Sequence, residues 1–411
     1  MKVKNSAWLI WLCWLVYTCS YIGKVNYSAN INQVMEFYNV GHSAAGLVGT
    51  FFFFSYGVGQ VVHGLLCKKY NLKWMIFASL IISGTVNLVV GITTNFTLIQ
   101  FLWLINGFSL SILWPCLIRL LSETLEKKEM AKASMVMGTT VAIGTFIVYA
   151  ASAIFVKINF RLAFYMATIV FFLAAGLWLI ASSSLIKKVQ QEKTETDVVE
   201  EATTNIEKKT VNRSLILLSV VMLCFYGVAT NLIKDGLTTW VPSILKEQYD
   251  LDNSLSIILT LALPIVAIFG NAFAIQLHKK VPDFVLQCAL TFLIAGIIIA
   301  GVIGGMQFNL FVLTLVGFAA VCLLVSSCNS MITSIFPLFM KGKVNSGKIA
   351  GILNGFCYVG STISSYGLGW IADNHGWLSV FWLLLSVCVV VCLGAGVYVF
   401  LKRKFKKKNP Q

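Results

Sequence analysis

Twelve stretches of this chain are mostly apolar and about twenty residues long, and they constrain the fold more than any other feature. A helix needs about 20 apolar residues to cross the roughly 30 Å hydrocarbon core of a bilayer. The stretches are 7–28, 44–66, 74–92, 97–121, 134–156, 162–182, 214–236, 254–277, 284–304, 309–333, 347–371 and 378–401. Only 11% of the 411 residues are charged, against about a quarter in soluble domains. The sequence therefore predicts an all-α integral membrane protein with twelve transmembrane helices.

Composition and motifs disfavour several other classes of protein. The net charge of +15 is spread over short loops, a distribution that does not indicate a nucleic-acid-binding face. The 11 cysteines include no CxxC pair and no zinc-type spacing with histidine, so we expect buried free thiols. The sequence contains no nucleophile–base pairing, phosphate-binding glycine loop or metal cluster. We therefore expect no enzymatic activity, no metal and no cofactor.

A hydrophilic segment divides the chain into two sets of six predicted helices. We expect an N-terminal six-helix half over 1–182, a cytoplasmic linker over 183–213, a C-terminal six-helix half over 214–401 and a basic cytoplasmic tail over 402–411. The linker has mixed charges and few apolar residues, which is typical of a solvated connector. The first apolar stretch is too long for the core of a signal peptide, and no small-residue cleavage site follows it, so we count it as a spanning helix.

The positions of the basic residues predict the orientation in the membrane. If both termini and the linker lie on one side, all but five of the 31 Lys and Arg residues lie on that side or in its loops. The five exceptions are Lys157, Arg161 and Lys246 on the opposite side, and Lys24 and Lys234 within spans. Because cytoplasmic loops carry an excess of Lys and Arg, we expect a multi-pass protein of the inner or plasma membrane with both termini cytoplasmic.

The two halves also repeat at the level of single residues. Lys24 and Lys234 lie 210 positions apart, and the dipeptides Gly107-Phe108 and Gly317-Phe318 share that offset. Two features at one offset indicate a duplication. Two six-helix halves related by a pseudo-twofold axis along the membrane normal describe the major facilitator fold, in which substrates bind near the bilayer midplane between the halves.

Lys24 and Lys234 are the strongest indication of function. A cation at bilayer depth costs roughly 2.5–3.5 kcal/mol on insertion scales, so lysines within spans usually serve a function. Two ammonium groups in one cavity repel each other, whereas a dianionic group such as phosphate neutralises both and offers several acceptor oxygens. We therefore expect the two lysines to converge on one vestibule and to bind a small organic anion.

Polar side chains line one face of four predicted helices. Residues at i, i+4 and i+7 share a helix face, and in lipid such a face must turn toward protein or water. The stripes are Tyr17, Tyr21, Lys24 and Ser28; Tyr226, Thr230, Lys234 and Thr238; Tyr56, Gln60 and His63; and Asn354, Tyr358, Ser361 and Ser365. The predicted substrate-binding residues are Lys24, Lys234, Tyr17, Tyr21, Tyr56, Gln60, Asn354 and Tyr358. Hydrogen bonding between helices is the alternative role for the Ser, Thr and Asn residues.

Two titratable residues are candidates for a coupling site or a counter-ion. Asp235 directly follows Lys234, but adjacent helical residues point about 100° apart, so the two need not pair. Asp235 has three other roles open to it: compensating Lys24, contacting water at a helix end or carrying a proton. His63 could titrate near neutral pH, with a structural role as the alternative.

Motifs in both halves resemble those of a known transporter family. They are Tyr17, Tyr21, Lys24 and Asn26 in the first helix; Tyr56-Gly57 in the second; Trp114-Pro115 and Arg119 in the fourth; Lys234, Gly236, Trp240 and Pro242 in the seventh; and Asn354-Gly355-Phe356, Gly360, Gly369 through Asp373 and Gly376-Trp377 toward the C-terminus. This pattern resembles the organophosphate:phosphate antiporter family of the major facilitator superfamily, which exchanges sugar or glycerol phosphates for inorganic phosphate. The resemblance is most specific in the seventh helix, and it implies that the two lysines take the place of phosphate-binding residues.

Several positions depart from the family pattern. Lys24 and Lys234 stand where the family has two phosphate-binding arginines, and Lys lacks the planar bidentate fork of Arg. Gln60 replaces a Lys of the second helix, Val141 stands at the position of a fifth-helix His, and Lys68-Lys69 stand where an Asp-Arg pair is usual. The fold and the preference for anions are expected to persist through these changes, while the substrate class stays open.

The sequence thus predicts a secondary active transporter that moves a small organic anion by alternating access, through exchange or ion coupling. A phosphorylated metabolite is the expected solute, the lipid bilayer is the expected environment, and a monomer is the expected state. The alternatives are a proton-coupled exporter, a carboxylate- or nitrate-type carrier, and a transporter-like sensor that binds a metabolite without moving it.

Overall fold

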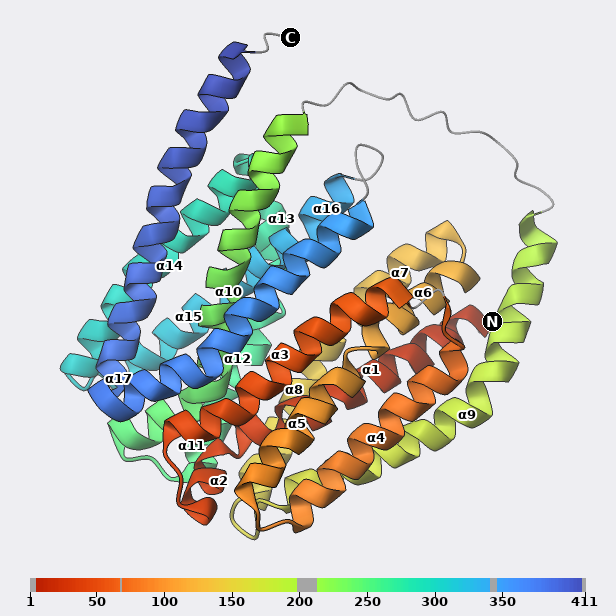
Figure 1. Cartoon of the computed structure of the whole chain (residues 1–411), viewed down its shortest axis with the longest axis horizontal. Coiled ribbons are helices and arrows are strands. Elements are labelled where there is room, and N and C mark those ends of the chain that lie inside the picture. Colours follow the sequence, from red (N-terminus) through yellow and green to blue (C-terminus); the bar gives the residue numbers. More distant parts are fainter. Residues whose placement is uncertain (1–4, 67–68, 198–212, 341–345, 409–411) are drawn as a thin grey trace. The chain divides into compact units, whose positions relative to one another are not determined.

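A computed structural model describes residues 5–66, 69–197, 213–340 and 346–408 of the chain. These residues form α-helices, turns and one π-helical segment (Figure 1). The helices gather into two compact units. Unit 1 comprises Met1–Gln33 and Phe54–Asn205, and unit 2 comprises Val34–Phe53 and Ile206–Gln411.

Unit 1 is built mainly from seven helices. They are α1 (Asn5–Ala29), α4 (Leu72–Ile92), α5 (Phe96–Leu110), α6 (Leu113–Thr124), α7 (Lys127–Met137), α8 (Thr140–Phe155) and α9 (Leu162–Asp197). The side chains of Asn71 and Asn95 accept hydrogen bonds from the first turns of α4 and α5, so both helices begin at an Asn cap. α1 packs against α8 and α9, and α4 runs beside α9 (Figure 1).

Two helices are shared between the units. α2 (Ile31–Tyr38) begins in unit 1 and ends in unit 2, whereas α3 (His42–Leu66) begins in unit 2 and continues into unit 1 from Phe54. Residues 34–53 therefore pack with the second half of the sequence, although the sequence places them in the predicted N-terminal half.

Unit 2 contains the remaining helices. They are α10 (Arg213–Tyr249), α11 (Asn253–Thr260), α12 (Ala262–Ala267), α13 (Gly270–Lys280), α14 (Phe284–Gln307), α15 (Phe311–Ser330), the π-helical segment η2 (Met331–Ile335), α16 (Phe336–Phe339) and α17 (Ser346–Lys408). α10 packs along α17, and α14 packs against both α15 and α17.

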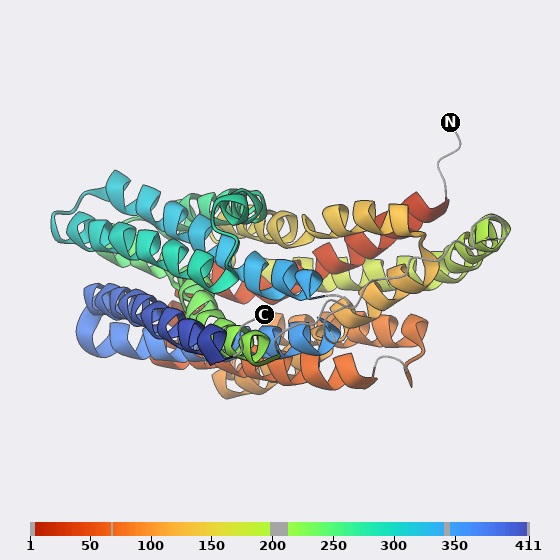
Figure 2. The same cartoon turned by 90° about the horizontal axis from the view of Figure 1, so that it is seen from above.

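The helices account for the twelve predicted spans. In the described part of the chain, ten helices are long and apolar enough to cross a membrane, and the pair Asn253–Ala267 and Gly270–Lys280, bent by 40°, forms one more span. α17 supplies the twelfth because its 63 residues double back at Gly376 (Figures 1 and 2, blue). The all-α, multi-pass fold class is thus confirmed.

The reversal in α17 depends on the backbone of Gly376. Its φ of 75° and ψ of 167° lie in a region that is essentially restricted to glycine. A residue with a side chain at this position is strained even though a Cβ would meet nothing within 4 Å. The turn sets the direction of the C-terminal arm and brings Asp373 and Trp377 to the same end of unit 2.

Two boundaries differ from the sequence-based expectation. α9 continues to Asp197, so helix extends well into the segment 183–213 that was predicted to be a linker, and residues 198–212 lie outside the described residues. α17 likewise continues to Lys408, into the predicted tail 402–411, of which 409–411 are not described. Both extensions are rich in Lys, Arg, Gln and Glu, which have good helix propensity.

A polar contact fixes the start of α14 against the end of α17. The Asp283 carboxylate caps α14 by accepting from the backbone N–H groups of Val285 and Leu286, at 3.0 and 3.1 Å. It also accepts from the Tyr398 hydroxyl at 3.1 Å and from the Lys402 ammonium. Burial alone would raise the pKa of Asp283, but these donors hold it below its usual range. Its stabilising contribution is therefore present at neutral pH and is lost as the pH falls through the folded-state pKa.

The conformation of Gly376 predicts the effect of adding a methyl group. Gly376→Ala is expected to lower the free energy of unfolding by about 1–3 kcal/mol, because Ala disfavours this backbone conformation. The matched control is Gly396→Ala in the same helix, where a Cβ also meets nothing within 4 Å but φ is not positive. Thermal unfolding of the detergent-solubilised variants checks this, and equal unfolding temperatures for the two variants would contradict it.

Candidate functional site

In unit 1, the ammonium group of Lys24 lies over two tyrosine rings. Its Nζ is 4.4 Å from the ring centre of Tyr56 on α3 and 5.0 Å from that of Tyr21 on α1. Both distances are within the range of about 6 Å at which the negative face of an aromatic ring attracts a cation. An aromatic ring carries no net charge, so these contacts position the ammonium group without neutralising it.

Two further predicted residues lie in the same part of unit 1. The Tyr17 ring is 5.6 Å from Tyr21 and 4.8 Å from Trp114 of α6. Gln60 lies one helical turn beyond Tyr56, and its side-chain amide donates to the carbonyl oxygen of Ser111 at 3.3 Å. Ring contacts thus link Tyr17 to Tyr21, and Lys24 to Tyr21 and Tyr56, whereas the side chain of Gln60 bonds to Ser111.

A buried amide network behind this cluster was not anticipated. Asn26 on α1 donates to the side-chain oxygen of Asn87 on α4 at 2.7 Å, and Asn106 on α5 donates to the backbone carbonyl of Gly23 at 3.0 Å. Each of the three asparagines is fully buried. Because an unpaired amide in an apolar interior is costly, these bonds fix α1 against α4 and α5 next to Lys24. Asn26 belongs to the first-helix motif of the family resemblance, whereas Asn87 and Asn106 were marked in the sequence only as polar residues within apolar stretches.

In unit 2, Lys234 and Asp235 form an ion pair. Their Nζ and Oδ1 atoms are 3.4 Å apart, and the side chains are 28% and 16% exposed. The neighbouring positions point in different directions on α10, but the long Lys side chain reaches back to the carboxylate. Of the roles left open for Asp235, the geometry within unit 2 agrees with that of a fixed counter-ion, with Lys234 as its ion-pair partner.

Asp235 is held in place by a chain of hydrogen bonds across three helices. The Ser361 hydroxyl on α17 donates to Asp235 Oδ2 at 2.5 Å, and the Asn231 amide on α10 donates to Ser361 Oγ at 3.0 Å. Asn329 at the end of α15 donates to Asn231 Oδ1 at 2.7 Å. Each group accepts from the next, so the carboxylate position is set by α10, α15 and α17 together.

The other predicted residues of unit 2 extend the same helix. Asn354 and Tyr358 lie about two turns and one turn before Ser361 on α17, and both are partly exposed. Trp240 on α10 is fully buried, and its indole N–H donates to the carbonyl oxygen of Ser365 at 3.2 Å. Its position indicates a role in packing α10 against α17.

His63 has the surroundings of a structural histidine. It is buried in unit 1, its Nδ1 lies 3.0 Å from the Tyr70 hydroxyl, and its ring packs 4.8 Å from that of Phe108. A coupling role for His63 stays a prediction, and these contacts favour the structural alternative.

Metal-binding groups were searched throughout the described residues. No group of three or more His, Cys, Asp or Glu side chains in them is arranged to hold a metal ion. Ten of the 11 cysteines lie in the described ranges, and these ten are free thiols. The candidate site therefore consists of two ammonium groups, tyrosines and amides.

The chain belongs to the Major Facilitator Superfamily, whose sequence profile matches residues 13–364. It is a multi-pass membrane protein of this transporter superfamily. Its resemblance to organophosphate exchangers is also seen among individual proteins.

Several named relatives are transporters of phosphorylated sugars. The chain is 22% identical over 377 residues to a "Probable hexose phosphate transport protein" of Chlamydia pneumoniae, covering 85% of this chain and 81% of that protein. It is 21% identical over 393 residues to "Sugar phosphate exchanger 3" of Bos taurus, covering 84% and 78%. A shorter match, 27% identical over 99 residues, covers 24% of this chain and 22% of the "Membrane sensor protein UhpC" of Escherichia coli.

Among solved structures, the fold is similar to that of a bacterial homologue of the human lysosomal transporter Spinster in an inward-facing, occupied conformation. The match has a TM-score of 0.72 and covers 100% of both chains at 13% sequence identity. At this level of identity the likeness concerns the fold alone.

The contact between Lys234 and Asp235 predicts a specific pattern of stabilities. Asp235→Leu leaves the Ser361 hydroxyl without its acceptor and Lys234 without its counter-ion, and is expected to lower the free energy of unfolding by about 1–3 kcal/mol. The double variant Lys234→Met/Asp235→Leu removes both charges and should recover part of this loss, because a pair replaced by apolar residues leaves no unpaired charge. Thermal unfolding of both single variants and the double variant checks this. Strictly additive changes would show that the two side chains are not coupled.

Proposed function

We propose that this protein is a secondary transporter of a small organic anion, namely a phosphorylated metabolite. The observation that supports it best is the pair of repeat-related lysines, Lys24 and Lys234, each partly exposed and positioned by fixed neighbours within its own unit. A fixed ammonium group inside a spanning segment is costly to retain. An anion bound at such an ammonium group compensates that cost.

The neighbours of the lysines suggest how the anion is bound. The Tyr21 and Tyr56 rings hold the Lys24 ammonium in position. In this proposal the polar groups of Tyr17, Gln60, Asn354 and Tyr358 orient the remainder of the substrate. Lys offers a compact charge with three donors and no fixed fork. In this proposal the lysines therefore supply attraction, while the tyrosines and amides supply orientation.

The relatives favour a phosphate ester as the anion. Two of the named relatives that align over most of their length are described as hexose phosphate or sugar phosphate transporters. Exchange for inorganic phosphate or coupling to an ion moves the substrate in this proposal. We further propose an inner or plasma membrane location, cytoplasmic termini and a monomeric state, which rest on the distribution of basic residues and on the fold.

A sensor is a second candidate function, and one observation favours it. A relative over 99 residues is described as a membrane sensor protein. A sensor of this kind binds a metabolite without net movement across the membrane. Binding of organic phosphates without any flux would identify it.

The role of the two lysines can be tested by transport in proteoliposomes. Exchange of radiolabelled inorganic phosphate for sugar phosphates is expected in the wild type and is expected to fall roughly 10- to 100-fold in Lys24→Gln and in Lys234→Gln. The expected loss corresponds to about 1.5–3 kcal/mol for a charge-assisted hydrogen bond. Lys24→Arg and Lys234→Arg keep the charge and should keep exchange.

An exposed lysine provides the matched control. Lys279 lies at the end of α13, is exposed and carries the same charge, so Lys279→Gln should exchange at the wild-type rate. Full activity of both Gln variants would contradict the proposed anion site. Transport of carboxylates or nitrate, but not of phosphate esters, would support the carboxylate- or nitrate-type carrier. Transport that ceases when the proton gradient is removed would support the proton-coupled exporter.

A further inference from the structure

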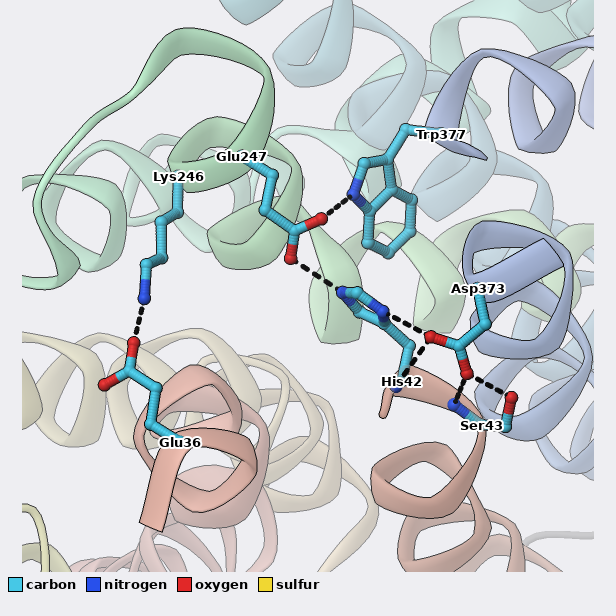
Figure 3. Close-up of polar contacts among 7 residues, drawn as sticks. All are labelled: Glu36, His42, Ser43, Lys246, Glu247, Asp373 and Trp377. Carbon is cyan, nitrogen blue, oxygen red and sulfur yellow. Dashed lines mark hydrogen bonds and ion pairs between the residues drawn. The ribbon is translucent and has the colours of Figure 1, made fainter. Parts of the chain in front are cut away.

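A histidine and two carboxylates meet at one end of unit 2 (Figure 3). His42 begins α3, Glu247 lies near the end of α10, and Asp373 lies shortly before the break in α17. His42 Nδ1 is 2.7 Å from Asp373 Oδ1, and His42 Nε2 is 2.7 Å from Glu247 Oε1. Glu247 is 13 residues beyond Lys234, about 20 Å along the helix, so this group is separate from the candidate substrate residues.

The two short contacts require one more proton than neutral histidine supplies. A neutral imidazole has one N–H donor and one acceptor nitrogen, and an ionised carboxylate can only accept. Two nitrogen–oxygen contacts at 2.7 Å need two hydrogens. The His42 group therefore holds an additional proton, either on the ring or on one of the carboxyl groups.

The surroundings place that proton on the imidazole ring. Asp373 also accepts from the backbone N–H groups of His42 at 2.9 Å and Ser43 at 2.7 Å, and from the Ser43 hydroxyl, so it caps the first turn of α3 as an anion. Glu247 accepts from the indole N–H of Trp377 at 2.8 Å. With both carboxylates stabilised as anions by other donors, the ring is the imidazolium form.

Other nearby groups support a cation at His42 or are otherwise engaged. The rings of Trp240 and Trp377 lie 5.6 and 5.1 Å from the imidazole, and aromatic rings attract cations. Lys246 of α10 pairs instead with Glu36 of α2 (Figure 3). On α17, the ring of His375 packs 6.0 Å from that of Trp370. The charged groups bonded to the His42 ring are thus Glu247 from α10 and Asp373 from α17.

A metal ion is a poorer occupant than a proton. The two ring nitrogens of an imidazole point in opposite directions, and here each already contacts a carboxylate oxygen directly. They cannot both bind one ion. Within the described ranges, no set of three such side chains is arranged for a metal, this group included.

We propose that His42, Glu247 and Asp373 form a proton-binding site, and that release of the proton separates the start of α3 from α10 and α17. Without it, one nitrogen lone pair faces a carboxylate, and two negative charges meet across a neutral ring. The side chains are 16%, 39% and 26% exposed, so a proton has a path to solvent. α3 and α17 also pack closely: a Cβ at Gly46 of α3 would lie 2.2 Å from the carbonyl oxygen of Ser365 on α17. The contact between the start of α3 and α17 is therefore sensitive to small displacements of either helix.

The site joins parts of the sequence that alternating access is expected to move. His42 lies two residues before the second predicted span, whereas Glu247 and Asp373 lie beyond the ends of the seventh and eleventh predicted spans, at the side predicted to be extracytoplasmic. Contacts between these spans must form in one state of a transporter and break in another. This link to transport rests on the proposed function, but binding of the proton does not.

Thermal unfolding of the detergent-solubilised full chain between pH 5.5 and 8.5 tests the site. An unfolded histidine titrates near pH 6.5, while the folded ring needs its proton for both contacts. Above that pH the native state binds more protons than the unfolded state, so the stability due to this site falls as the pH rises. The excess of the wild-type unfolding temperature over that of His42→Gln is therefore expected to be largest near pH 6 and to shrink by at least half at pH 8.5.

Two other variants keep the test decisive. His375→Gln removes an exposed histidine two positions from Asp373 and should keep the wild-type pH profile. Glu247→Gln keeps the shape of the side chain but removes one carboxylate, and should flatten the profile as His42→Gln does. A wild-type excess over His42→Gln that stays constant across the pH range would overturn the proton-binding site.

Exchange in proteoliposomes with the external pH set at 6 and at 8 tests the link to transport. The wild-type rate is expected to change several-fold between the two values, and the His42→Gln rate is not. A wild-type exchange rate that is the same at both external pH values, or a pH response that persists in His42→Gln, would overturn the link between the proton site and transport. Absence of exchange with every organic phosphate would count against the proposed function, while the unfolding profiles would still decide whether the proton site exists.

Discussion

The low polarity of the membrane interior is the constraint on which the rest of this structure depends. Inside a span, each ammonium, carboxylate or amide group must find a partner within the protein or contact water, because lipid offers none. Asn26 and Asn87 in unit 1 and the network around Asp235 in unit 2 meet this requirement with side-chain pairs. Polar residues therefore occur in connected clusters, and these clusters locate the functional candidates.

The two units stabilise their lysines by different chemistry. Lys24 lies over the Tyr21 and Tyr56 rings, which attract the cation but leave its charge intact. Lys234 lies beside Asp235, which offsets much of its charge. If the halves arose by duplication, they have diverged at this point. In the proposed transporter, an anion bound at Lys234 would compete with Asp235 for the ammonium group.

Local patterns in the sequence predicted the structural features that depend on residues only a few positions apart. The apolar stretches predicted the spans, and the spacing of Tyr17, Tyr21 and Lys24 placed the three on one face of α1, as the structure confirms. The contact between Lys234 and Asp235 was missed because the 100° rule describes backbone directions, and a long side chain can bend back. α9 continues past the predicted span because Lys, Gln and Glu have good helix propensity.

Contacts between distant residues could not be read from the sequence. His42 is 205 positions from Glu247 and 331 from Asp373, and no local pattern relates the three. The grouping of residues 34–53 with the second half of the chain depends on the same contacts. Gly376 was recognised only as part of a motif, whereas its positive φ is what brings Asp373 and Trp377 together.

The two polar clusters of unit 2 act on the same pair of helices. α10 and α17 are joined by Ser361 and Asp235 at one level, and by Glu247 and Trp377 at another, with a bond between Trp240 and Ser365 in between. A ligand at Lys234 that draws the ammonium group away from Asp235 alters the packing of α10 against α17. The same two helices also carry the carboxylates that contact His42. If an anion at Lys234 shifts α10 against α17, the anion and the His42 proton change each other's affinity by the same factor, because thermodynamic linkage is reciprocal.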